Sequence, residues 1–129
     1  MIFQKEVMLR NESVFLTGDF VISAGCVLFR RSPDASRTLQ ICLIHASRDR
    51  WLLPKGRKDV GESIDVTAAR ETYEETGYMC ELVPVHMPTR ATVPGDTRNI
   101  ATVRENITEP IAISTRDVVK GTEIGRAHV

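Results

Sequence analysis

The segment from Gly56 to Tyr78 constrains the fold of this chain more than any other part of the sequence. Ser63 is a residue type that caps helix N-termini, and Gly77 is the type that ends helices in a left-handed conformation. The sequence between them therefore predicts a helix over residues 64–76. We expect its buried surface to include Ile64 and Ala68, with Val66, Ala69 and Tyr73 as further candidates.

Three carboxylates gather on one side of this helix. Glu71, Glu74 and Glu75 stand at positions i, i+3 and i+4, which places their Cβ atoms about 5–6 Å apart. Like charges at such distances repel by up to roughly 3 kcal/mol per pair at an effective dielectric of about 20. A bound cation would offset this repulsion, and a hard divalent ion with oxygen ligands matches the carboxylates best.

The spacing of the polar residues in this segment resembles the signature of a known family. The fixed positions are Gly56, Glu62, Arg70, Glu71, Glu74, Glu75 and Gly77. They match the Nudix box, G-x5-E-x7-R-E-U-x-E-E-x-G-U, where U is a bulky or aliphatic residue. Thr72 departs mildly from this pattern at the first U, and Tyr78 fills the last. The chain therefore resembles the Nudix hydrolases, which cleave pyrophosphate linkages.

The resemblance implies a metal site on the helix. It makes Glu74 and Glu75 the principal ligands of Mg²⁺, with Mn²⁺ as the alternative ion. The carbonyl of Gly56 is a further expected ligand, because glycine lets the backbone approach closely. Glu71 is expected either to be a third carboxylate ligand or to orient the attacking water. The chemistry implied is attack of water at phosphorus, without a covalent intermediate.

Several charged residues around the expected metal site have supporting roles. Arg70 cannot act as a base, since its pKa exceeds about 12; we expect it to pair with Glu62 or Glu71 and to fix the carboxylates. Glu62 is then a supporting residue or an outer metal ligand. Lys55 and Arg57 flank the first glycine of the box, so they are candidates for binding substrate phosphates.

The box specifies the reaction but not the substrate. The run WLLPKGRKDVGES resembles the dinucleoside polyphosphate and diphosphoinositol polyphosphate hydrolases, and we favour these small substrates. Messenger-RNA decapping and hydrolysis of oxidised nucleotides are the alternatives within the family. A Nudix-fold binding or regulatory module without catalysis is the alternative of another class. Glu105 and Glu109 are candidates for the general base by location alone.

The family resemblance implies an α/β fold, an α/β/α sandwich around a mixed β-sheet. Apolar runs predict strands over residues 20–29 and 39–46, paired through the loop between them. Further strands are expected over residues 80–85 and 111–113, and Gly25 is expected to permit a close backbone approach. No clear pattern is present in the polar stretch that follows Pro88.

The length of 129 residues predicts one domain. Residues 123–129 back-translate to a run that resembles a sequencing adapter. We therefore expect a single Nudix domain over residues 1–122, incomplete at its C-terminus, and a non-native tail over residues 123–129.

Composition restricts the expected partners and compartment. The net charge is zero, so a small phosphoanhydride is expected as the partner, and neither nucleic acid nor a membrane. Cys26 and Cys42 lie in apolar runs and are expected to be small buried hydrophobic residues. Three cysteines without paired spacing indicate a reducing compartment, the cytoplasm or alternatively the nucleus. The oligomeric state is left open.

Overall fold

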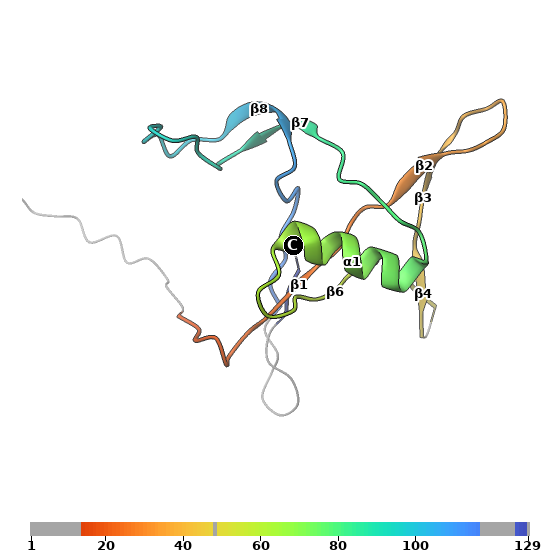
Figure 1. Cartoon of the computed structure of the whole chain (residues 1–129), viewed down its shortest axis with the longest axis horizontal. Helices are drawn as coiled ribbons and strands as arrows, with labels where there is room; N and C mark the ends of the chain where they lie inside the picture. Colours follow the sequence, from red (N-terminus) through yellow and green to blue (C-terminus); the bar gives the residue numbers. More distant parts are fainter. Residues whose placement is uncertain (1–13, 48, 117–125, 129) are drawn as a thin grey trace, which may run out of the picture.

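A computed structural model describes residues 14–47, 49–116 and 126–128 of the chain. One helix and nine strands occur in this part of the chain. The helix is α1 (Ile64–Thr76), and the strands are β1 (Val21–Ala24), β2 (Phe29–Arg31), β3 (Leu39–Ile41), β4 (Ile44–Ala46), β5 (Arg50–Leu52), β6 (Gly56–Arg57), β7 (Val85–Thr89), β8 (Thr102–Ile107) and β9 (Arg126–His128). Figure 1 shows α1 near the centre, with β1 and β6 running beside it.

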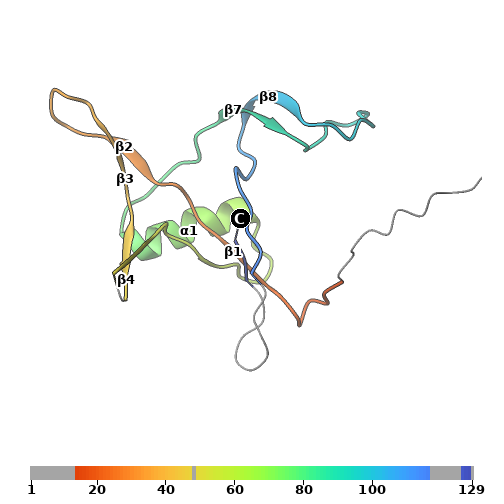
Figure 2. The same ribbon diagram turned by 180° about the vertical axis from the view of Figure 1, so that it is seen from behind.

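A small mixed sheet supports the helix. Its strand order is β6-β1-β9, in which β1 is antiparallel to β6 and parallel to β9. The register between β1 and β6 places Ala24 opposite Gly56, so the first residue of the box belongs to the sheet. The view from behind in Figure 2 shows the hairpins β2–β3 and β7–β8 extending away from α1. The box therefore begins in the sheet, at β6, and continues into α1.

The bounds of the helix confirm the prediction. Gly77 adopts a left-handed conformation with φ of 74°, and its N–H donates to the Tyr73 carbonyl. Ser63 occupies the N-cap position, but its side chain makes no capping hydrogen bond. The nearby Ser63 hydroxyl is the largest of the effects that lower the pKa of the Asp65 carboxyl. The helix begins and ends where local sequence signals place it.

The predicted buried face of the helix was partly wrong. Ala68 is buried as expected, but Ile64, Val66 and Tyr73 are exposed, and Ala69 is half-buried. The buried positions besides Ala68 are Thr67 and Thr72. Their hydroxyls bond to neighbouring backbone and side-chain groups, which offsets the cost of burying them. Small side chains at these positions let the helix approach the backbone of β1.

Several predicted strands were also corrected. The run 20–29 divides into β1 and β2, and the run 39–46 divides into β3 and β4. Residues 80–84 and 111–113 are not strands, while β8 lies in the polar stretch where no element was expected. The pairing of β2 with β3 through the intervening loop occurs as predicted. Cross-strand partners decide these bounds, and a short apolar run does not identify its partner.

Burial of the cysteines differs from the expectation. Cys26, Cys42 and Cys80 are all half-buried and unpaired rather than fully enclosed.

Of the two helical layers expected for an α/β/α sandwich, the described residues contain one. None of their helices is long and apolar enough to cross a membrane. Part of the predicted tail, Arg126–His128, pairs with β1, while 123–125 and 129 lie outside the described residues.

Gly25 lies where the chain leaves β1, and the backbone there leaves no room for a side chain. A Cβ at this position would overlap the Pro54 carbonyl oxygen and the Lys55 backbone. We expect Gly25→Ala to lower the free energy of unfolding by about 1–3 kcal/mol, because a backbone atom must move. Gly18→Ala is the matched control, since nothing lies near its Cβ. Equal urea midpoints for the two variants would contradict the close approach.

The loop of the β7–β8 hairpin is organised by Asp96. Its carboxylate accepts from Arg98 Nε and Nη2, both at 2.9 Å, and from Arg104 Nη2 at 3.2 Å. The hydrogen bond from Arg98 is the largest of the effects that lower the pKa of Asp96 from 3.8 to about 2. A carboxyl whose pKa falls on folding stabilises the folded state above its ordinary pKa.

This shift predicts an acid-dependent loss of stability. The contribution of Asp96 is complete above its ordinary pKa of 3.8 and disappears as the pH falls toward about 2. We expect Asp96→Asn to lose less of its stability than the wild type between about pH 5 and about pH 3. Urea midpoints at the two pH values measure this difference. Identical acid dependence in both proteins would show that the arginine pairs do not stabilise the fold.

Candidate active site

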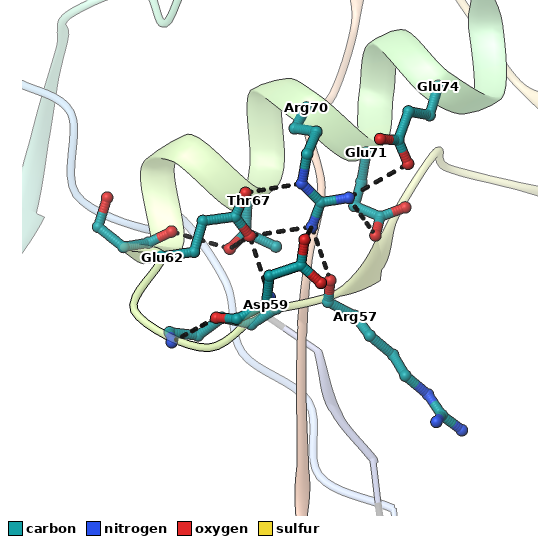
Figure 3. Close-up of polar contacts among 9 residues, drawn as sticks. Arg57, Asp59, Glu62, Thr67, Arg70, Glu71 and Glu74 are labelled. Carbon is teal, nitrogen blue, oxygen red and sulfur yellow. Dashed lines mark hydrogen bonds and ion pairs between the residues drawn. The ribbon is translucent and has the colours of Figure 1, made fainter.

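The guanidinium of Arg70 is the centre of the box (Figure 3). Its Nε and Nη2 donate to the two oxygens of Glu62 at 2.6 and 2.9 Å, a bidentate pair. Its Nη1 donates to Glu71 at 2.9 Å and to Glu74 at 3.2 Å. Nη2 also donates to the Arg57 carbonyl at 2.9 Å. One planar group thus holds three carboxylates and the loop that precedes the helix.

The electrostatics of this cluster follow from its geometry. The hydrogen bonds from Arg70 are the largest cause that lowers the pKa of Glu62 to about 2, and the Thr67 hydroxyl adds to the shift. The same carboxylates, Glu62 first and then Glu71, raise the pKa of Arg70. Glu62 therefore remains ionised at neutral pH and is fully engaged, so its position suits it to hold Arg70 rather than to accept a proton.

The glycine of the box lies against a carboxylate. A Cβ added to Gly56 would overlap the carboxylate of Glu71, so only glycine leaves room for this approach. The Lys55 N–H donates to Oε2 of Glu75 at 2.8 Å. Two carboxylates of α1 therefore reach the Lys55–Gly56 backbone from the helix. These two contacts bring three of the four expected ligands to one place, namely Gly56, Glu71 and Glu75.

Glu74 lies slightly apart from this group. One of its oxygens contacts Arg70, and its side chain is 55% exposed, against 14% for Glu71. Among the described residues, no three carboxylate, histidine or cysteine side chains converge as a ready-made metal-binding group. The four expected ligands Gly56, Glu71, Glu74 and Glu75 nevertheless offer only oxygen donors on one helix and one loop. This donor chemistry fits a hard divalent ion such as Mg²⁺ or Mn²⁺.

The remaining predicted residues occupy different positions. Arg57 contributes its carbonyl to the Arg70 cluster, while its side chain points away from it (Figure 3). Lys55 contributes its N–H to Glu75. Glu105 lies on β8, 3.4 Å from His86, and Glu109 lines a cavity beside α1. The structure thus places Lys55 and Arg57 at the box and the two candidate bases on other segments.

Sequence analysis missed two residues of the cluster. The Thr67 hydroxyl donates to Glu62 Oε2 at 2.7 Å and to the Ser63 carbonyl at 2.8 Å. Asp59 lies 3.8 Å from Arg70, and its N–H donates to Glu62 at 3.1 Å. Thr67 stands among the variable positions of the box, so the motif itself gives no signal for it. Its place on the same helical face as Arg70 and Glu71 was the only available indication.

Comparison with known proteins decides the family. The NUDIX domain matches residues 19–125 of this chain. The chain belongs to the Nudix family. The assignment made from the Gly56–Tyr78 box is thereby confirmed, and with it the α/β Nudix fold.

Curated relatives of this Nudix chain come from distant organisms. An 8-oxo-(d)GTP phosphatase of Mycolicibacterium smegmatis is 39% identical over 85 residues, 60% of this chain and 26% of that protein. Putative nudix hydrolase 1 of Caenorhabditis elegans is 38% identical over 61 residues, 46% of this chain and 17% of that one. The chloroplastic Nudix hydrolase 21 of Arabidopsis thaliana is 38% identical over 60 residues, 45% of this chain and 30% of that one. The chain spans less than a third of each.

A solved structure also aligns with this Nudix chain. The crystal structure of C. elegans Ap4A hydrolase matches with a TM-score of 0.46 and 22% identity. The alignment covers 84% of this chain and 64% of that one.

Proposed function

We propose that this Nudix domain hydrolyses a phosphoanhydride bond of a small polyphosphate by attack of water at phosphorus, with Mg²⁺ as its cofactor and Mn²⁺ as a substitute. The observation that carries the proposal is the Arg70 guanidinium, which holds Glu62, Glu71, Glu74 and the loop at Arg57 in one arrangement. A fixed cluster of carboxylates beside a glycine backbone suits the binding of a divalent cation, and such a cation would neutralise the charge on the phosphate oxygens.

Each residue of the box has a part in this reaction. Gly56, through its carbonyl, and Glu71, Glu74 and Glu75 would hold the ion. When bound, the ion supplies Lewis-acid neutralisation of the phosphate charge. Arg70 and Glu62 position these carboxylates. The Glu71 side chain is 14% exposed and the Glu74 side chain is 55% exposed. The proposal gives Glu71 one of two roles, the third carboxylate ligand or the group that orients the attacking water.

The cations that precede the helix are proposed to bind substrate. Lys55 and Arg57 flank Gly56, and the Arg57 side chain extends away from the Arg70 cluster. Its charge is therefore available to a phosphate that approaches the glycine. Because the chain as a whole is neutral, this local charge favours a small polyphosphate over a long polyanion.

Diadenosine polyphosphates and diphosphoinositol polyphosphates are the favoured substrates, on the resemblance of the Pro54-Lys55-Gly56 entry to those enzymes. An oxidised nucleoside triphosphate is the second candidate. It is favoured by the 39% identical relative described as an 8-oxo-(d)GTP phosphatase. Both candidates carry a phosphoanhydride bond, so one assay compares them.

The test is hydrolysis of a substrate panel by the purified chain. The panel contains diadenosine tetraphosphate, a diphosphoinositol polyphosphate, 8-oxo-dGTP and capped RNA, each with Mg²⁺, with Mn²⁺ or with EDTA. We expect metal-dependent turnover of a small substrate, and isotope from ¹⁸O-water in a phosphate product. Turnover that persists in EDTA would contradict the proposed dependence of hydrolysis on a divalent metal ion. A folded chain that binds but cleaves none of the four would be a non-catalytic Nudix module.

Gly56→Ala tests the approach of Glu71 to the loop. The added Cβ would overlap the Glu71 carboxylate, which is the free end of a flexible side chain and must swing away from the loop. We expect kcat to fall by roughly tenfold or more, since small displacements of catalytic groups slow reactions strongly. Steady-state kinetics measure the loss, and Gly18→Ala is the control without a nearby atom. Unchanged kcat in Gly56→Ala would remove Glu71 from the site.

A further inference from the structure

Two of the three cysteines line one cavity beside α1 and the end of β1. The cavity has a volume of about 780 Å³ and lies between α1, the end of β1 and the segments 79–85 and 108–111. Cys26 and Cys80 both line it, together with Ala68 and Met79. Both cysteines are half-buried and unpaired. The proposed reaction at the box uses neither of them.

The backbone brings these two cysteines together from distant parts of the chain. Cys26 follows β1, and its N–H donates to the Thr72 hydroxyl on α1 at 3.1 Å. Gly77 ends α1 in a left-handed turn, so the chain that carries Cys80 turns back beside the helix. Burial raises the pKa of the Cys80 thiol, and the charge and hydrogen bonding of the adjacent Cys26 add to the rise. Both cysteines therefore lie at the same cavity, one from the end of β1 and one from the segment after α1.

Cys42 has different surroundings. Its N–H donates to the Leu28 carbonyl at 2.8 Å, beside the pairing of β2 with β3. It is half-buried like the other two cysteines, but it is not among the residues that line the cavity. It therefore serves as an internal control for any reaction of the pair.

We propose that Cys26 and Cys80 form an intramolecular disulfide when the protein meets a peroxide. One thiol loses its proton, and the thiolate attacks the peroxide O–O bond, which breaks to give a sulfenic acid and a hydroxide that takes up the released proton as one water. The second thiol then attacks the sulfenic sulfur, so the S–S bond forms and a second water leaves. Two thiols are oxidised, and one hydrogen peroxide is reduced to two waters. The cavity gives the oxidant access to both sulfurs.

The disulfide would change the stability of the domain. It would join the end of β1 to the segment that leaves α1, and the closed loop would contain the complete Gly56–Tyr78 box. Closing a long loop restricts the unfolded chain. We expect the melting temperature to rise by roughly 10 °C on oxidation. The proposal does not rest on the hydrolytic function, since neither sulfur belongs to the box.

The experiment is disulfide mapping of the folded chain. The chain is treated with hydrogen peroxide, free thiols are blocked, and trypsin digestion without reductant is followed by mass spectrometry. Trypsin places the three cysteines in separate peptides, residues 11–30, 38–48 and 71–90. We expect a linked pair of the first and third peptides, lighter than their sum by two hydrogen atoms. The chain in urea is the reference, in which all three pairings compete.

Variants separate the proposal from general oxidation. Cys42→Ser is expected to keep the cross-link and the rise in melting temperature, while Cys80→Ser loses both. The proposal would be overturned if cross-links of Cys42 in the folded chain formed in the same yield as the cross-link between Cys26 and Cys80. It would also be overturned by disulfides only between molecules, or by three thiols that stay free or become sulfinic acids. The mapping on the unsubstituted chain decides the question even where a variant fails to fold.

Discussion

Glu74→Gln is expected to lower kcat by roughly 10³-fold, the largest loss predicted for this domain. Glutamine has nearly the same shape as glutamate but carries no charge, and a hard divalent ion binds an anionic carboxylate more strongly than a neutral amide oxygen. One Glu74 oxygen contacts Arg70 at 3.2 Å, and the side chain is 55% exposed. The carboxylate is therefore reachable by an ion and a substrate, and its replacement leaves the buried face of α1 unchanged.

The measurement is kcat at saturating Mg²⁺, with circular dichroism to show that the helix is intact. Glu81→Gln is the matched control, because Glu81 is an exposed glutamate outside the box. It should keep its activity within about twofold. A Glu74→Gln protein as active as this control would remove Glu74 from the proposed metal ligands, while the rest of the cluster would stand.

Arg70→Lys is expected to lower kcat by roughly 10²-fold and to lower the melting temperature as well. Lysine keeps the charge, but a single ammonium cannot replace a planar fork with donors to Glu62, Glu71 and Glu74. Loss of the guanidinium would also remove the hydrogen bond from Arg70 Nη2 to the Arg57 carbonyl. The carboxylates would then be held less firmly, and the loop would separate from the helix.

A comparison with Arg30→Lys isolates the role of the cluster. Arg30 is exposed and donates through Nε to Gln40 at 2.9 Å, so the same substitution there should change neither property appreciably. Kinetics and thermal melting of both variants complete the test. If Arg70→Lys retained full kcat and melted normally, charge alone would suffice, and the bidentate geometry would have no catalytic consequence.

The parts of this protein that were predictable from sequence are those that depend on local chemistry. The bounds of α1 follow from the residues next to them, with Gly77 in the left-handed conformation that glycine adopts readily. The Nudix box depends only on spacing, and family membership is confirmed. The roles of its individual carboxylates stay predictions.

What the sequence could not predict depends on contacts between distant segments. Thr67 and Thr72 are buried because of the rotation of α1 about its axis relative to β1 and β6. The hydrophobic pattern instead indicated Ile64 and Val66, which are exposed. Strand β8 is stabilised by its register with β7, which a polar sequence does not reveal. The close approach of Gly25 to the Pro54 carbonyl, where β1 ends, is likewise a contact between distant segments.

The hydrogen bond from the Lys55 amide to Glu75 has a consequence for ion affinity. One Glu75 oxygen already accepts that N–H, so an ion that binds Glu75 either shares the carboxylate with the amide or displaces it. Loop position and ion occupancy are in either case thermodynamically linked. A contact that favours this position of the Lys55–Gly56 segment therefore changes the free energy of ion binding. Ion binding changes the free energy of that loop position by the same amount.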